Sequence, residues 1–323
     1  MFRTVLKTKS SNHKIAHDKN ILSIGSCFAA MMGEKLSENK FISETNPFGV
    51  IFNPISIFKL LNHAIDGSFP RDNGYVEYNG IWYNYDLHSR LSHSDKGILK
   101  SEVESKINKL NDYLKTTDYL IVTLGTAYVY ELNSSGEIVA NCHKLSAAKF
   151  TKRLLGVSEI VASFDTLIKN IAKINSKIKI ILTVSPVRHV KDTLKLNTVS
   201  KSVLRLAAHE VSERFSIVDY FPSYEIMMDD LRDYRFYKSD MLHPSAVAEK
   251  YIWELFMGTY FFGETAALIA KWQKIKQAID HRPFHQDSSS HKKFLIDTLK
   301  RLKVLNEEMP LSEEIKKFEA RII

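Results

Sequence analysis

The sequence predicts a doubly wound α/β sandwich, because short apolar runs alternate along it with amphipathic segments. Four runs have the length and β-branched content of strands that are buried on both faces, as in a parallel sheet. They are 20–26 (NILSIGS), 118–126 (DYLIVTLGT), 177–186 (KIKIILTVSP) and 215–222 (FSIVDYFP). Strands that alternate with helical segments in this way are typical of a parallel sheet covered by helices.

The segments between these runs have helical character. They are 29–40, 53–66, 101–114, 163–176 and 202–215. The second begins with Asn53 and Pro54, a typical cap and first-turn pair. In the fourth, Phe164, Leu167 and Ile171 recur at the spacing of one helix face, so we expect that face to pack on the sheet.

Residues 70–98 interrupt the alternation. They are rich in Tyr and Trp and contain Asn79-Gly80, which is a hairpin turn signal. We therefore predict an inserted aromatic β-hairpin, whose rings either form the wall of a pocket or cover the edge of the sheet.

The end of the chain has a different pattern. Residues 265–280 and 292–308 are amphipathic at helical spacing and are joined by a polar segment. This predicts a main domain over 1–258 and a helical appendage over 259–323. The appendage packs either on the main domain or on a partner chain, so a homo-oligomer formed through these helices is one expectation.

Composition narrows the class of protein. The 323 residues carry a formal net charge of +8, but Lys and Arg are spread along the chain, which favours a solvated basic surface over a nucleic-acid binder. The two cysteines, Cys27 and Cys142, form no disulfide framework and no Cys-x-x-Cys metal motif. No secretory apolar core and no apolar run of about 18 residues is found, so we expect a cytoplasmic protein without a membrane span.

Two short stretches have residues suited to nucleophilic catalysis. Residues 21–36 read as strand, tight turn and helix, an arrangement that presents a nucleophile in many enzymes, and Ser26 and Cys27 lie in the turn. Asp240 and His243 are three residues apart just before a predicted helix at Pro244. That spacing can bring the carboxylate to the imidazole and fix its tautomer.

This order of motifs resembles the SGNH (GDSL-type) hydrolases, whose fold is a flavodoxin-like three-layer α/β/α sandwich. More closely, GSCFA at 25–29 is similar to the motif that names the GSCFA family, a branch distantly similar to those hydrolases. Further stretches that fit this family are 46–57 (NPFGVIFNPISI), 123–130 (TLGTAYVY), 139–145 (VANCHKL), 185–192 (SPVRHVKD), 220–236 (YFPSYEIMMDDLRDYRF) and 240–245 (DMLHPS). The resemblance covers roughly residues 2–260.

The resemblance implies roles for individual residues. Asp240 would orient His243, His243 would act as general base, and the Gly49 N–H would donate to the oxyanion. The Gly-x-Asn of the hydrolase pattern is replaced here by Gly125-Thr126-Ala127, so the second donor is missing.

Three side chains are candidates to replace that missing amide. They are Thr126 within the same segment, Asn141 from the VANCHK segment, and Asn53. The sequence leaves the choice among them open.

The identity of the nucleophile also stays open. An ungapped match puts Cys27 at the position of the hydrolase serine, whereas a shift of one residue puts Ser26 there. A thiol at a helix N-terminus beside an imidazolium would have a lowered pKa and would react through a thioester. A third alternative is that neither residue attacks and Cys27 closes the strand–helix junction.

The predicted function is acyl-ester hydrolysis or acyl transfer on a small-molecule or glycan ester, with neither metal nor organic cofactor. Arg188 follows a predicted strand and either grips an anionic substrate group or forms a surface ion pair. The rival prediction is a catalytically impaired binding module for a glycan or an anionic ligand. If neither Cys27 Sγ nor Ser26 Oγ lies within about 4 Å of a His243 ring nitrogen, the hydrolytic prediction fails, with allowance for the looser geometry of a site without substrate.

Overall fold

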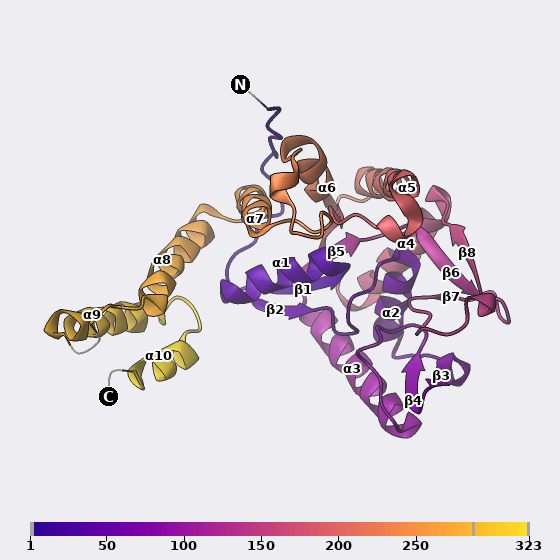
Figure 1. Cartoon of the computed structure of the whole chain (residues 1–323), viewed down its shortest axis with the longest axis horizontal. Coiled ribbons are helices and arrows are strands. Elements are labelled where there is room, and N and C mark those ends of the chain that lie inside the picture. Colours follow the sequence, from indigo (N-terminus) through magenta and orange to yellow (C-terminus); the bar gives the residue numbers. More distant parts are fainter. Residues whose placement is uncertain (1–2, 286–287, 322–323) are drawn as a thin grey trace.

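A five-stranded parallel sheet lies at the centre of the protein, in a computed structural model that describes residues 3–285 and 288–321 (Figure 1). Its strands are β1 (Asn20–Gly25), β2 (Ile42–Thr45), β5 (Tyr119–Leu124), β9 (Lys179–Val184) and β10 (Val218–Phe221). They pair in the order β10-β9-β5-β1-β2, which is the flavodoxin-like order of a doubly wound fold. The prediction of an α/β sandwich is therefore confirmed.

Helices cover both faces of this sheet and complete three layers. One face is covered by α2 (Pro54–Asp66), α3 (Lys96–Thr116), α4 (Val157–Ile174) and α5 (Thr193–Arg214), and the other by α1 (Cys27–Glu38) and α7 (Ala246–Tyr260). Side chains of β5 alternate between the two cores: Leu120 and Val122 belong to the first, Ile121 to the second. This is why the sequence of β5, YLIVTL, is apolar almost throughout.

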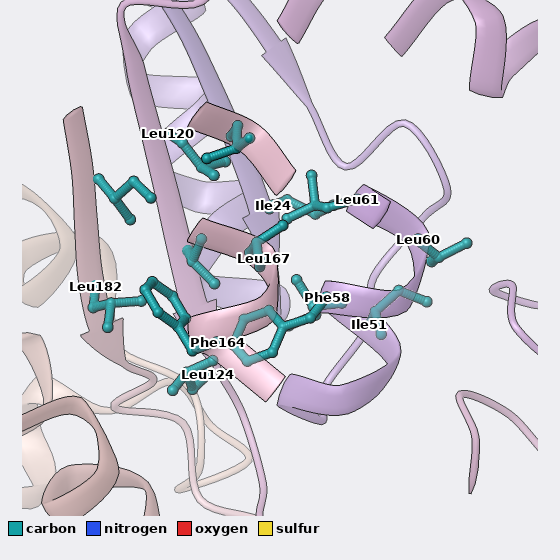
Figure 2. Close-up of a cluster of buried hydrophobic side chains, with 14 of the residues drawn as sticks. Ile24, Ile51, Phe58, Leu60, Leu61, Leu120, Leu124, Phe164, Leu167 and Leu182 are labelled. Carbon is teal, nitrogen blue, oxygen red and sulfur yellow. The ribbon is translucent and has the colours of Figure 1, made fainter. Parts of the chain in front are cut away.

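The larger core joins the sheet to α2 and α4. The rings of Phe58 and Phe164 meet edge to face, with centroids 5.2 Å apart and planes at 78°, and they pack beside Leu124 and Leu182 of the strands (Figure 2). Burial of side chains of this size contributes roughly 1.5–3 kcal/mol each. The helix face predicted from Phe164, Leu167 and Ile171 is fully buried here.

The aromatic insertion is a β-hairpin, as predicted. Strands β3 (Tyr75–Tyr78) and β4 (Ile81–Asn84) pair antiparallel. Asn79 (φ 52°) and Gly80 (φ 76°) form the turn, and both have the positive φ of the hairpin turn that Asn-Gly favours. Tyr75 and Trp82 pack against the larger core.

A second antiparallel sheet was not predicted. It joins β7 (Ile138–Val139), β6 (Tyr128–Leu132) and β8 (Phe150–Leu154). The shorter helical turns, also not predicted, are Asp72–Gly74, Ala147–Lys149, Val190–Asp192, Ser223–Glu225, Ile226–Asp230 and Tyr234–Phe236.

The end of the chain forms three helices that extend from one side of the sandwich (Figure 1). They are α8 (Gly263–Asp280), α9 (Ser289–Leu305) and α10 (Ser312–Glu319), of which the sequence predicted the first two. They share a small apolar core of their own, and Trp272 Nε1 donates to the Glu38 carbonyl at the end of α1 (2.7 Å). The domain boundary at residue 258 and a homo-oligomer through these helices stay predictions.

The helices of the described residues offer no candidate for crossing a membrane, because none is both long and apolar enough.

Candidate functional site

The turn between β1 and α1 is held tightly against the neighbouring strand. Gly25 has φ +135°, and a Cβ atom there would lie 2.1 Å from the Thr123 carbonyl oxygen of β5. The Ser26 N–H donates to that same oxygen (3.1 Å), and the Ser26 Oγ accepts from the Phe28 N–H (3.3 Å). Ser26 is thus the N-cap of α1 and is only 1% exposed.

Cys27 is the first residue of α1 and is half-buried. It lines a cavity of about 250 Å³ together with His243. The remaining lining residues are Phe28, Ala30, Met31, Glu34, Val187, Lys238, Pro244 and Glu249. Cys27, unlike Ser26, therefore lines the same cavity as the histidine of the predicted site.

The electrostatics of Cys27 differ from the prediction. Burial raises the pKa of its thiol, and a hydrogen bond from its own backbone N–H offsets only part of this. The lowered pKa expected at a helix N-terminus is therefore wrong for this structure, and the thiol is the resting form at neutral pH. Over the described residues, the Cys27 N–H has no acceptor on another residue.

Asp240 and His243 form a hydrogen-bonded pair. Asp240 Oδ2 lies 2.6 Å from His243 Nδ1, while Asp240 Oδ1 accepts the backbone N–H groups of Leu242 (2.9 Å) and His243 (3.0 Å). These three donors lower the pKa of the Asp240 carboxyl to about 2. An ionised carboxylate only accepts, so Nδ1 carries the ring proton and Nε2 is left with its lone pair.

Two backbone hydrogen bonds close the loop that carries Asp240 and His243. The Lys238 N–H donates to the His243 carbonyl (2.7 Å), and the Ser245 N–H donates to the Phe236 carbonyl (2.7 Å) as α7 begins. Met241, at the tip, has φ +59°. This geometry allows Asp240 to turn back onto the imidazole three residues later.

Neither candidate nucleophile is hydrogen-bonded to the histidine: within residues 3–285 and 288–321, no such bond joins His243 to Cys27 or to Ser26. At the wall of the cavity, Lys238 Nζ and Glu249 Oε1 form an ion pair of 3.0 Å, which sequence patterns did not indicate.

Two of the predicted oxyanion donors are already used in local turns. The Gly49 N–H donates to the Asn46 carbonyl (2.8 Å), and Asn53 caps α2 by accepting the Ser56 N–H (2.8 Å) and donating to its hydroxyl (3.0 Å). In this conformation the Gly49 N–H and one of the two Asn53 Nδ2 hydrogens are thus engaged within the protein.

The other two predicted donors are also engaged. Thr126 is buried, and its hydroxyl lies 3.1 Å from the Ser200 Oγ on α5. Asn141 donates to Ser89 Oγ (3.1 Å) and accepts the His143 N–H (2.9 Å). The residues that line the cavity of Cys27 include none of these four predicted donors.

Arg188 lies directly after Val187, which lines the cavity. Its guanidinium carbon is 4.5 Å from the ring centroid of Tyr237 and 5.7 Å from that of Tyr234. No ion pair of the described residues includes Arg188, so the alternative of a surface ion pair is not found. Its role in gripping an anionic group stays a prediction.

Lys201 was missed by sequence reasoning. Its side chain is fully buried on α5, and Nζ donates to the Gly125 and Ser185 carbonyls at the exits of β5 and β9 (2.7 Å each). Burial lowers the pKa of its amine to about 7. Burial and this neighbouring amine lower the pKa of His189, near the site, to about 4. In the sequence, the burial of Lys201 was indicated only by its position three residues before Leu204, on the same face of α5.

Comparison with known proteins gives the family. The family model described as GSCFA family matches residues 20–256. The chain belongs to the GSCFA family. A second model, described as GSCFA domain protein, C-terminal domain, matches residues 272–323 of this GSCFA protein. No curated protein resembles the sequence closely enough to count as a match.

Solved structures similar to this GSCFA protein are distant in sequence. One is a Streptococcus pneumonia protein whose description refers to platelet activating factor, with 13% identity over 74% of this chain and 82% of that chain and a TM-score of 0.39. Another is a Corynascus thermopiles (Myceliophthora fergusii) carbohydrate esterase family 2 enzyme with a carbohydrate binding domain. It has 14% identity over 49% of this chain and 38% of that chain, with a TM-score of 0.28.

Proposed function

We propose that this GSCFA protein is an acyl-ester hydrolase or acyltransferase in which Cys27 attacks, His243 is the general base and Asp240 orients the imidazole. The observation that carries the proposal is the shared cavity: Cys27 and His243 line it together, and Asp240 holds His243 through a bond of 2.6 Å. The substrate class is a small-molecule or glycan ester. Neither a metal nor an organic cofactor is part of the proposed chemistry.

The resting thiol requires a base. Because burial raises the pKa of Cys27, the proton leaves Sγ for His243 Nε2 only as Sγ attacks the ester carbonyl carbon. The ionised Asp240 stabilises the imidazolium that forms. The C–O bond to the alcohol then breaks, the alkoxide takes the proton from Nε2, and a thioester remains on Cys27.

The second half of the reaction releases the acyl group. Water gives hydrolysis and a second alcohol gives transfer; in either case His243 Nε2 accepts the proton of the incoming oxygen and returns it to Sγ. The Cys27 N–H, with no other residue as acceptor in the described structure, is the first candidate to stabilise the oxyanion. The mechanism requires Sγ and Nε2 to come within hydrogen-bond reach once an ester is bound.

Ser26 is the weaker candidate for attack. Its hydroxyl caps α1 and its side chain is 1% exposed, whereas Cys27 is half-buried at the cavity. A Ser26→Ala substitution should lower stability through loss of the cap by roughly 1 kcal/mol, but it should leave the chemistry in place.

A binding module for an anionic ligand or a glycan is the second candidate function. One argument for it is that the predicted oxyanion donors already form hydrogen bonds within the protein; these are Gly49, Asn53, Thr126 and Asn141. The other is that the guanidinium of Arg188, which follows Val187 of the cavity lining, lies near two tyrosine rings. An anionic group of the ligand would pair with Arg188.

The test compares the two cysteines of the same chain. We expect iodoacetamide to alkylate Cys27 and Cys142 in the full-length protein, with the rate at each site resolved by mass spectrometry. His243→Ala and Asp240→Asn should slow alkylation of Cys27 at pH 7 by tenfold or more and leave Cys142, the internal control, unchanged. Equal rates at Cys27 in all three proteins would contradict the proposed general base.

A second measurement addresses turnover. The part of p-nitrophenyl acetate hydrolysis that iodoacetamide abolishes should fall at least 100-fold in Cys27→Ala and should survive in Cys142→Ser. If Cys27→Ala leaves turnover intact, the proposed nucleophile is wrong. If neither protein turns over the ester and binding of acidic ligands is lost in Arg188→Met, the binding module is the better description.

A further inference from the structure

We propose that Ser89 is a second nucleophile of this protein, with His143 as its general base, outside the cavity of Cys27 and His243. The pair reacts with carboxylic esters, which acylate the serine, and with fluorophosphonate probes, which phosphonylate it. Ser89 lies in the segment after the hairpin, and His143 lies in the segment after β7. The proposal does not rest on the chemistry of Cys27.

The tautomer of His143 is fixed by a backbone carbonyl. His143 Nε2 lies 2.7 Å from the Asn84 carbonyl oxygen, which can only accept, so Nε2 carries the proton. Nδ1 therefore has the free lone pair, and it lies 3.0 Å from Ser89 Oγ. The Ser89 hydroxyl is the donor in this bond, which directs its proton to the base.

The environment keeps the imidazole neutral and fixed in place. His143 is 3% exposed, and burial lowers its pKa, so the ring can accept a proton at neutral pH. It stacks on Tyr83 with centroids 4.8 Å apart and planes at 24°. The backbone of His143 has φ +48°, and its N–H donates to Asn141 Oδ1 (2.9 Å), which holds the turn.

Ser89 has the features of an accessible nucleophile. It is half-buried, and its Oγ accepts a hydrogen bond from Asn141 Nδ2 (3.1 Å) while donating to His143. Among the described residues, no acceptor is found for the Ser89 N–H, although the following amide of Arg90 donates to His88 Nδ1 (3.2 Å). An unused amide on the nucleophile itself is suited to stabilise an oxyanion.

The nucleophile, the base and the group that orients the base are thus in hydrogen-bond contact in the same conformation. In the proposed step, Ser89 Oγ bonds to the ester carbonyl carbon as its proton passes to His143 Nδ1. The C–O bond to the alcohol breaks, the departing alkoxide takes that proton, and an acyl-Ser89 ester remains. Water then attacks this ester, gives one proton to Nδ1, and the acid and free Ser89 are released as the proton returns to Oγ.

A fluorophosphonate probe tests the proposal on the full-length Cys27→Ala variant, in which the first candidate nucleophile is absent. Mass spectrometry of the peptides should find the probe on Ser89 and at least tenfold less on Ser105, an exposed serine of α3 that serves as control. Labelling should be lost in Ser89→Ala. Equal labelling of Ser89 and Ser105, or no labelling of Ser89, would overturn the proposal.

The role of the base is tested without removing the buried imidazole, whose loss could unfold the region. In Ser89→Cys, the thiol beside His143 Nδ1 should react with iodoacetamide at pH 7 at least tenfold faster than the Ser105→Cys thiol. Equal rates for both thiols would show that His143 does not activate position 89. Circular dichroism of the two variants verifies that both are folded.

Discussion

The buried amine of Lys201 predicts a pH dependence of stability that one substitution removes. Its pKa is about 7 in the folded protein, against an ordinary value of 10.5. Between these values the unfolded chain binds more protons than the folded chain, so the free energy of unfolding rises with pH. The slope is at most about 1.4 kcal/mol per pH unit, and from pH 7 to pH 9 the rise amounts to roughly 2 kcal/mol.

Lys201→Met should abolish this rise. The substitution also leaves the Gly125 and Ser185 carbonyls without their donor, at a cost of roughly 1–3 kcal/mol each, but that cost does not vary with pH. The raised pKa values of Cys27 and Cys142 work in the opposite direction near pH 9, equally in both proteins. The difference between the two proteins therefore isolates the lysine.

Urea unfolding at pH 7, 8 and 9 measures this difference. The free energy of unfolding of the natural protein minus that of Lys201→Met should increase by about 2 kcal/mol over this range, with equal m-values. A difference that stays constant with pH would refute the assignment of a lowered pKa to this amine.

Three further substitutions test the fold. Gly25→Ala places a Cβ 2.1 Å from the Thr123 carbonyl and should cost roughly 2 kcal/mol or more, seen as a lower urea midpoint. Phe164→Ala empties part of the larger core and should cost roughly 3–5 kcal/mol in the same assay, and a loss below 1 kcal/mol would contradict its packing. Trp272→Phe removes the bond to the Glu38 carbonyl and should speed proteolysis within α8–α10 while the sandwich stays resistant.

The sequence predicted β1, β5, β9 and the edge strand β10 because each of them lies within a continuous apolar run. β2 was missed because ISET is only four residues long and its residues are exposed or half-exposed at the edge of the sheet. The β7-β6-β8 sheet was missed for a related reason, since most of its side chains are only half-buried and β7 has two residues. Short strands outside a continuous apolar run lack the pattern on which such predictions depend.

The candidate site was less predictable than the fold. The contact of Asp240 with His243 follows from a local spacing, and the structure has that hydrogen bond. Asn53, in contrast, was expected both to cap α2 through its Oδ1 and to serve as an oxyanion donor through its Nδ2, and here Nδ2 donates to the Ser56 hydroxyl. The structure uses it as the cap. Lys201 was missed because a lysine is normally taken as exposed, and only the surrounding strand exits show which carbonyls it satisfies.

The choice between Ser26 and Cys27 depends on the direction that the tight turn gives to each side chain. Residues at an N-cap and at the first helical position differ by one step, yet their side chains point in different directions because the cap still has extended backbone (ψ −178°). A serine at the cap is useful to the helix itself, since its hydroxyl satisfies an amide that would otherwise have no partner. The next residue, Cys27, does not cap the helix, and it lines the cavity that His243 also lines. On this argument the cap residue supports the turn, which is why Cys27, and not Ser26, is the proposed nucleophile.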